Sequence, residues 1–432
     1  MNIAVVGLWH LGTVTAACLA SAGYTVIGFD ENAEIIDGLQ KGQLPVFEPG
    51  LEDLVRRGAE TGRCAFSSNP ADLAAAEIIW ITYDTPVDET DRADVEYVIH
   101  RVTTIFSFVS EGVLVLISSQ LPVGSTRRLE EIYRRVRPGG TATFAYSPEN
   151  LRLGKAIEAF TRPERVVGGV RTAEDRARIE RLLKPFAKRI EWMSVESAEM
   201  TKHALNAFLA TSVVFINELS ALCERVGADA REVERGLKSD GRIGPRAYLR
   251  PGLAFAGGTL ARDVAFLVDI GRSEGLGTHL CSAVLLSNEA HRQWSRRRLM
   301  EAFGNLHGRP IAILGLTYKP GTDTLRRSGA VEICHWLREQ GALIAAYDPA
   351  VKTLPAELTE FIQLRPSVEM TLRGADAVLV ATEWPEFSSI RAADVVEWMA
   401  QPIVLDPGRF LETNVAADKR IRYLAVGGAA QA

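Results

Sequence analysis

The sequence predicts an α/β protein with two doubly wound, Rossmann-like domains joined by a central helical domain. Two observations lead to this fold class. Short runs rich in β-branched residues alternate with amphipathic segments of helix length near both ends of the 432-residue chain, which is typical of a parallel sheet covered by helices on both faces. Between residues 195 and 294 the strand pattern stops and helical periodicity replaces it.

The first doubly wound domain is expected to cover residues 1–194. It is predicted from short, apolar runs that have the length and composition of buried parallel strands. These runs are residues 3–6, 25–29, 78–82, 113–118 and 143–146.

A central helical domain is expected over residues 195–304 and a second doubly wound domain over residues 305–432. From residue 199 to 226 apolar residues keep helical spacing, which predicts one long helix. Strands are then predicted at 311–314, 343–347, 377–381 and 403–405. The two ends also begin alike, because a strand leads to Gly7 or Gly315 and a second strand leads to Asp30 or Asp348.

Composition narrows the class of protein. A net charge of -5 and a pI near 5.9 give no support for binding to nucleic acid or to an anionic membrane. No uninterrupted apolar run reaches the roughly 18 residues that span a bilayer, and we expect no signal peptide. Five scattered cysteines without a CxxC spacing predict a reduced, cytoplasmic protein without a structural metal site.

A dinucleotide site is predicted after the first strand. Gly7, Leu11 and Gly12 belong to a Gly-Leu-Trp-His-Leu-Gly segment that opens a helix, and Asp30 follows the second strand. This context and spacing match a dinucleotide fingerprint. An acidic residue in that place accepts hydrogen bonds from the ribose hydroxyls and disfavours a 2′-phosphate, so the expected cofactor is NAD.

The fingerprint has one conspicuous departure, because Trp9 stands where the middle glycine lets the pyrophosphate approach the backbone. Three alternatives are open. The loop rearranges and another cofactor pose is used, Trp9 and His10 pack over a closed site, or no dinucleotide binds. Asp84, beside Thr85, would also place a negative charge near the phosphates.

Residues 251–263 read Pro-Gly-Leu-Ala-Phe-Ala-Gly-Gly-Thr-Leu-Ala-Arg-Asp. This segment resembles the active-site signature of the UDP-glucose/GDP-mannose 6-dehydrogenases. Other segments resemble the same family in the same order, and together they span nearly the whole chain. They are residues 45–51, 93–97, 119–124, 147–152, 163–168, 199–206, 217–218, 242–244, 315–320 and 381–384.

The resemblance places Thr259 where the family has a nucleophilic cysteine. A thiolate lets those enzymes carry an alcohol through a thiohemiacetal and a thioester to a carboxylate in two hydride transfers. A threonine hydroxyl has no depressed pKa and is a poor substitute. The chain therefore resembles a nucleotide-sugar dehydrogenase whose usual chemistry is altered or lost.

Other catalytic and cofactor residues follow from the same resemblance. Lys202, Asn206 and Asp263 correspond to the group that handles the water and oxyanion at the reacting carbon. Glu149 corresponds to the carboxylate that helps water attack the thioester. Thr85 and Gln120 occupy positions near the cofactor, together with Gly7, Trp9, His10, Leu11, Gly12 and Asp30.

The resemblance also implies a substrate site for a nucleotide sugar. Arg242, Lys319 and Arg326 align with basic residues that hold the diphosphate, for which arginine's planar fork is well suited. Arg409 resembles another basic position near the substrate and the subunit interface. Phe255 and Gly257 belong to the glycine-rich substrate loop. Because the residue at the position of Arg242 reaches the partner subunit's site in that family, a homodimer is implied.

Three functions fit these observations. The first is an NAD-dependent oxidoreductase that makes one hydride transfer on a nucleotide sugar and gives an aldehyde or ketone. The second is a nucleotide-sugar-binding protein without redox activity. The third comprises a redox-neutral enzyme that uses the same basic pocket, or a dehydrogenase with an unusual nucleophile.

Overall fold

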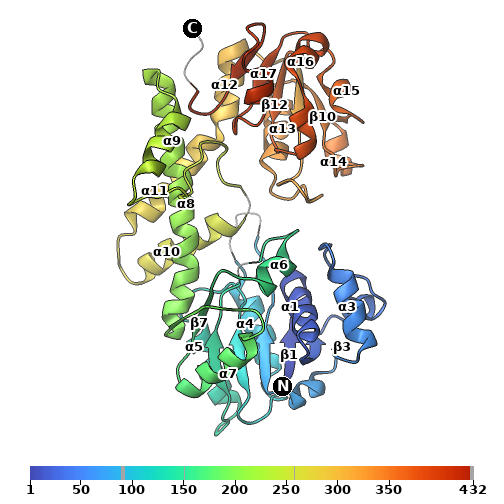
Figure 1. Cartoon of the computed structure of the whole chain (residues 1–432), viewed down its shortest axis with the longest axis vertical. Coiled ribbons are helices and arrows are strands. Elements are labelled where there is room, and N and C mark those ends of the chain that lie inside the picture. The colour runs from blue at the N-terminus through green and yellow to red at the C-terminus, as the bar shows by residue number, and fades with distance from the viewer. Residues whose placement is uncertain (89–92, 150, 257, 429–432) are drawn as a thin grey trace. The chain divides into compact units, whose positions relative to one another are not determined.

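The computed structural model describes residues 1–88, 93–149, 151–256 and 258–428 (Figure 1). The chain divides into two compact units, Met1–His203 and Ala204–Ala432. The domain boundaries predicted at 194 and 304 remain predictions.

The first unit is built on an eight-stranded sheet with the order β3-β2-β1-β4-β5-β6-β7-β8. Its described pairs are parallel except for the antiparallel pair of β6 with β7. The strand order reverses between β1 and β4, which opens a crevice at the carboxyl ends of these strands. The strands are β1 (Asn2–Val6), β2 (Thr25–Phe29), β3 (Cys64–Ser67), β4 (Ile78–Ile81), β5 (Leu114–Ile117), β6 (Thr143–Tyr146), β7 (Val166–Gly169) and β8 (Ile190–Met193).

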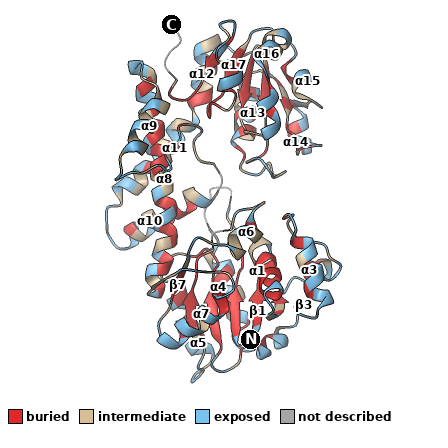
Figure 2. Cartoon of the chain, in the orientation of Figure 1, coloured by how far each residue is buried: buried red, intermediate tan, exposed pale blue. Residues whose placement is uncertain are grey.

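Helices cover both faces of this sheet. One apolar layer joins the sheet to α1 (His10–Ser21), α2 (Ala33–Gln40), α3 (Leu51–Glu60), α6 (Ala156–Thr161) and α7 (Ala173–Leu183). The layer on the other face joins it to the short helix η1 (Pro70–Ala75), to α4 (Val95–Thr104), to α5 (Ser125–Val136) and to the start of α8 (Val195–Val226). Figure 2 shows the buried strands between helices whose outer faces are exposed.

The second unit carries a six-stranded parallel sheet with the order β11-β10-β9-β12-β13-β14. The strands are β9 (Pro310–Leu314), β10 (Leu343–Tyr347), β11 (Ile362–Leu364), β12 (Ala377–Val380), β13 (Ile403–Leu405) and β14 (Arg422–Leu424). One face packs on α12 (Trp294–Phe303), α13 (Gly329–Glu339) and α14 (Ala356–Thr359). The other packs on α15 (Val368–Leu372), the short helix η2 (Pro385–Ser389), α16 (Ala392–Trp398) and α17 (Glu412–Val415).

Besides α12, four helices lie between the two sheets along the described part of the chain. They are α8, α9 (Ala230–Ser239), α10 (Gly258–Ser273) and α11 (His279–Arg292), and apolar residues of α8, α10 and α11 form one cluster. By length and composition alone, α8 could cross a membrane. However, its buried His203 and Asn217 hydrogen-bond to the backbone of Leu121 and of Leu253, as expected for a core helix.

The predicted fold class is confirmed. Both sheets contain the strand order of a doubly wound domain, and the predicted long helix is α8. The predicted strands all exist with ends within one residue of the observed ones. Five strands were not predicted from the sequence, namely β3, β7, β8, β11 and β14.

Candidate active site

The loop between β1 and α1 has the geometry of a dinucleotide site. Gly7 has φ +93°, and a Cβ on Gly12 would lie 1.9 Å from the carbonyl oxygen of Gly7, so both positions require glycine. Asp30 accepts hydrogen bonds from the backbone N–H groups of Leu8 at 2.8 Å and Asn32 at 3.0 Å. The start of α1, where the structure describes every residue, has no capping side chain and no acidic residue in its first turn. These residues fit the cofactor, since such a helix start favours a phosphate.

Trp9 fits this loop without backbone strain. Its φ of -82° and ψ of -152° are ordinary extended values, so the fold does not need a glycine here for conformational reasons. The residue is 45% exposed, so it lies at the surface with about half of its area covered. Whether it stands in the path of the pyrophosphate remains a prediction.

His10, the first residue of α1, contacts a buried carboxylate. The Glu48 side chain is 1% exposed and accepts hydrogen bonds from His10 Nε2 at 2.9 Å, from Gly154 N–H at 2.8 Å and from Ala156 N–H at 2.8 Å. Three donors satisfy this carboxylate, as burial of a charge requires. Glu48 therefore ties the cofactor loop to the segment that follows Glu149. The sequence offered no signal for this role.

Lys202 and Glu149 come together in the first unit. The buried ammonium of Lys202 donates to the carbonyl oxygen of Glu149 at 2.6 Å, and it lies 3.4 Å from its Oε1. The second carboxylate oxygen accepts from Leu151 N–H at 2.8 Å. Both side chains are thus oriented before any substrate binds.

Thr85 and Gln120 are also neighbours. The Thr85 hydroxyl donates to the carbonyl oxygen of Gln120 at 2.7 Å, and both residues are buried. The two residues that were separately predicted to lie near the cofactor are therefore neighbours, and their contact with NAD remains a prediction.

Asn206 and Asp263 form a second buried pair, in the other unit. The Asn206 side-chain amide donates to Asp263 Oδ2, and Asp263 is 0% exposed. Asn206 follows Lys202 by one helical turn in α8. Thr259 is exposed in the first turn of α10 and precedes Asp263 by one turn, so the two share a helix face.

The substrate loop before α10 is held by side chains from two helices. Asn217 of α8 accepts from Gly252 N–H at 3.1 Å. Asn288 of α11 accepts from Phe255 N–H and donates to its carbonyl oxygen, both at 3.0 Å. His291 Nε2 donates to Gly252 O at 2.7 Å, and burial lowers the pKa of this imidazole. These contacts make the loop a rigid wall of a cavity.

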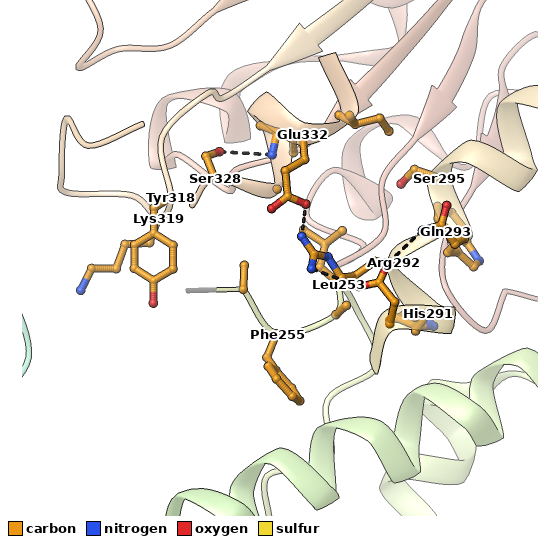
Figure 3. A pocket seen from close by; sticks show the side chains of 18 of the residues that line it. Leu253, Phe255, His291, Arg292, Gln293, Ser295, Tyr318, Lys319, Ser328 and Glu332 are labelled. Carbon is orange, nitrogen blue, oxygen red and sulfur yellow. Dashed lines mark hydrogen bonds and ion pairs between the residues drawn. The ribbon is translucent and has the colours of Figure 1, made fainter. Parts of the chain in front are cut away.

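That cavity has a volume of about 430 Å³ and lies wholly within the second unit. Phe255, Thr259 and Lys319 line it, as predicted. Figure 3 shows Tyr318 and Lys319 on one side and Arg292, paired with Glu332, on the other. Aromatic rings and cations in one concave site suit a nucleotide with its phosphates. The sequence analysis did not single out Tyr318, although it lies in the recognised segment 315–320. It missed Tyr248, Arg292, Ser328 and Glu332, because they lie outside the recognised segments.

Comparison with known proteins decides the family. Three family models match in order: the UDP-glucose/GDP-mannose dehydrogenase NAD binding domain over residues 1–187, the central domain over 196–290 and the UDP binding domain over 312–413. The chain belongs to the UDP-glucose/GDP-mannose dehydrogenase family. Its first sheet is the family's NAD binding domain and its second sheet the UDP binding domain.

Relatives and solved structures agree with this assignment. The chain is 35% identical over 408 residues to the UDP-glucose 6-dehydrogenase TuaD of Bacillus subtilis, covering 94% of this chain and 88% of that protein. It is 33% identical to the UDP-glucose 6-dehydrogenase of Rhizobium meliloti, covering 99% of both. A UDP-glucose dehydrogenase structure from Pyrobaculum islandicum superposes with a TM-score of 0.88 at 29% identity, covering 99% of this chain and 98% of that chain. The predicted family, the NAD cofactor and a nucleotide sugar as the substrate class are confirmed.

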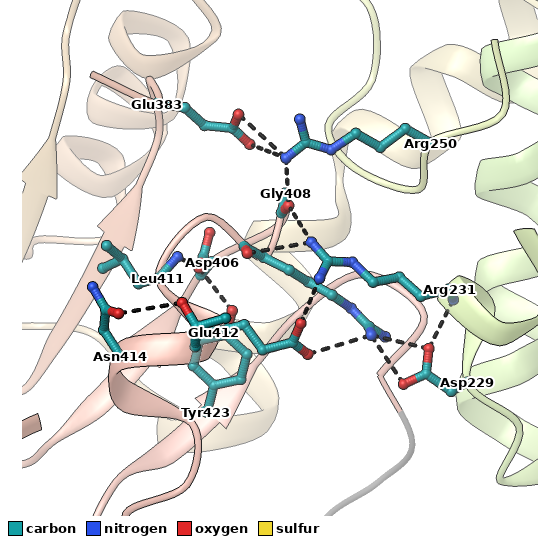
Figure 4. Close-up of polar contacts among 12 residues, drawn as sticks. Asp229, Arg231, Arg250, Glu383, Asp406, Gly408, Leu411, Glu412, Asn414 and Tyr423 are labelled. Carbon is teal, nitrogen blue, oxygen red and sulfur yellow. Dashed lines mark hydrogen bonds and ion pairs between the residues drawn. The ribbon is translucent and has the colours of Figure 1, made fainter. Parts of the chain in front are cut away.

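Three arginines that were predicted to contact the substrate do not line this cavity. The Arg242 side chain is 90% exposed and pairs with Asp240 at 2.7 Å, and the exposed Arg326 does not line the cavity. Arg409 is buried outside it and donates to both Asp229 oxygens at 2.9 Å. Figure 4 shows its surroundings, where Arg231 pairs with Glu412. Substrate contacts for these arginines remain predictions, and Gly257 lies outside the described residues.

Proposed function

We propose that this protein is an NAD-dependent oxidoreductase that oxidises one alcohol of a nucleotide sugar to a carbonyl and stops there. The observation that carries the proposal is that Thr259 lines the cavity, because the family resemblance assigns this residue to the position of the catalytic cysteine. Among the described residues, no cysteine lines that cavity. Without a thiol the aldehyde or ketone is not captured as a covalent adduct, and the second oxidation does not follow.

The proposed step is one two-electron oxidation. NAD would be held by the loop that contains Gly7 and Gly12 and by Asp30, and it would supply the acceptor for the hydride on the carbon that carries the hydroxyl. The hydroxyl proton goes to the Asp263 carboxylate, directly or through a water, and the carbonyl C=O forms. Lys202 and Asn206 supply an ammonium and an amide for the oxygen while it carries negative charge. Because Asn206 is hydrogen-bonded to Asp263, the acceptor of the proton and a donor to the oxygen are held side by side.

The nucleotide would bind in the 430 Å³ cavity of the UDP binding domain. Lys319 supplies a cation for the diphosphate. Phe255, Tyr248 and Tyr318 supply apolar ring surface for the base and sugar. The relatives named above act on UDP-glucose by their names, so we take UDP-glucose as the first substrate to test.

Product identification tests the proposal. Purified protein is incubated with NAD and a panel of UDP- and GDP-hexoses, and the products are analysed by mass spectrometry after trapping with a hydrazine. We expect a trapped carbonyl product that has lost two hydrogens. A uronic acid as the main product would contradict the proposal.

A second function is favoured by one specific observation, the indole of Trp9 in the fingerprint loop. If the ring excludes NAD, the protein binds nucleotide sugars without oxidising them. Calorimetry would then show nucleotide-sugar binding by protein that neither binds NAD nor forms NADH.

We also propose a homodimer. Phe208, Phe215 and Leu222 recur every seven residues along α8 and are 70%, 47% and 61% exposed. An exposed apolar stripe of this kind favours burial against a second copy of the helix. Sedimentation should give twice the mass of 47.2 kDa, and Phe208→Asp should shift the protein to monomer. A monomeric wild type would contradict this proposal.

A cytoplasmic location is the last part of the proposal. All five cysteines are free, and four of them are buried as reduced thiols, which suits a reducing compartment. Cell fractionation followed by immunoblotting tests the location, and recovery outside the cytoplasmic fraction would contradict it.

A further inference from the structure

Three side chains meet beside the carboxylate that is expected to hold the cofactor's ribose. Glu31 follows Asp30 at the end of β2. Its carboxylate accepts a hydrogen bond from the Tyr83 hydroxyl at 2.7 Å and forms an ion pair with Arg101 of α4. The Tyr83 ring packs against Gly7, where an added Cβ would lie 2.6 Å from the ring. The group therefore stands at the crevice between β1 and β4.

Arg101 is held in place by more than its ion pair. Its guanidinium lies 4.8 Å from the centre of the Tyr97 ring and 5.9 Å from that of Tyr83. The quadrupole of a ring attracts a cation by itself, so these contacts do not depend on the Glu31 charge. Arg101 is also close enough to act on Asp30. Burial raises the pKa of the Asp30 carboxyl, and the Arg101 charge opposes that rise.

Discrimination between NAD and NADP depends on one phosphate at the ribose 2′ position. A nearby arginine accommodates that phosphate in proteins that use NADP. Arg101 carries the positive charge that would bind a 2′-phosphate, and it lies near Asp30. Its guanidinium, however, is already paired with Glu31. The Glu31 carboxylate would also repel a 2′-phosphate by a second like charge beside Asp30.

We propose that Glu31 determines the preference for NAD over NADP by occupying Arg101, and that Arg101 is a latent site for the 2′-phosphate. This inference rests on the NAD site of the proposed function and adds a residue to it that the fingerprint does not contain. The ion pair is partly exposed, with side-chain exposures of 26% for Arg101 and 36% for Glu31. Pairs of this kind contribute little to stability, so variants of Glu31 should fold.

The experiment compares two pairs of ligands by calorimetry. NADP and NAD form one pair. Adenosine 2′,5′-bisphosphate and 5′-AMP form the other, and they probe the adenosine end without a pyrophosphate that must pass Trp9. The measured quantity is the ratio of the dissociation constant of the 2′-phosphorylated ligand to that of its partner.

We expect Glu31→Gln to lower this ratio at least about tenfold, the effect of one charge-assisted hydrogen bond. Glu31→Gln combined with Arg101→Gln should lose that gain. The matched control is Glu34→Gln, which removes an equal charge from the exposed start of α2 and should leave the ratio within about threefold of wild type. Thermal unfolding of each variant verifies folding.

Two results would overturn the inference. One is a ratio for Glu31→Gln equal to that of Glu34→Gln, and the other is a gain that survives removal of Arg101. Failure of the proposed function looks different. In that case the wild type binds neither NAD nor NADP, while the mononucleotide pair still reports on Glu31 and Arg101.

Discussion

Replacement of Trp9 by glycine should strengthen NAD binding. The substitution restores the close approach of the pyrophosphate to the backbone and to the uncapped start of α1. One additional hydrogen bond to a charged phosphate contributes about 1.5–3 kcal/mol. We therefore expect the dissociation constant of NAD to fall at least about tenfold, which corresponds to about 1.4 kcal/mol.

The same change should cost stability. A tryptophan buries on the order of 200 Å² in a protein, and Trp9 keeps about half of its surface buried. Loss of roughly 100 Å² of apolar contact lowers the free energy of unfolding by about 2.5 kcal/mol. Glycine is tolerated at the residue before a helix, so the backbone adds little to this cost.

Calorimetric titration with NAD, below the unfolding temperature of both proteins, measures the effect. Trp9→Phe is the control, because it keeps a ring on the same backbone and should bind NAD like the wild type. If wild type already binds NAD tightly and the glycine variant binds no better, the ring does not obstruct the cofactor. The reasoning about Trp9 would then be refuted, and the alternative of a protein without redox activity would lose its support.

Three further predictions follow from the site. Alkylation at neutral pH should modify the partly exposed Cys281 before Cys18, because burial raises the pKa of the Cys18 thiol to about 12; peptide mapping checks the order. Because burial lowers the pKa of His291 from its ordinary 6.5, folding favours the neutral ring, and the free energy of unfolding should fall as the pH drops through 6.5 toward the lowered pKa; His291→Gln should flatten the dependence of thermal unfolding on pH. Thr259→Cys alone should not reach a typical enzymatic rate of uronic acid formation, about 1 per second, because Trp9 and Asp84 would still depart from the family pattern in the predicted cofactor site.

Four of the five strands that the sequence did not predict lie at the edges of the two sheets. β3, β8, β11 and β14 are the edge strands of the two sheets. An edge strand is covered on fewer sides, so it needs fewer apolar residues. β8 is only partly buried along its whole length, and β11 has a single fully buried residue. Central strands such as β4 and β5 are buried at every position, and their continuous apolar runs were recognised.

Residues of the candidate site could be predicted where they belong to a short, continuous sequence motif. Lys202 and Glu149 were each recognised by their own segments, and the structure joins them. The contact between His10 and Glu48 links residues 38 positions apart, and the contact between Arg409 and Asp229 links residues 180 apart. No sequence pattern encodes such pairs, because they depend on how the sheet brings its loops together.

The most direct test of the central claim is the number of NADH molecules formed for each nucleotide sugar consumed. A limiting amount of UDP-glucose, or of whichever nucleotide sugar is turned over, is converted completely with excess NAD, and absorbance gives the total NADH. The single hydride transfer that we propose, on the prediction that Thr259 takes the place of the thiol, gives one NADH per sugar. Two NADH per sugar, with a uronic acid as product, would contradict the account.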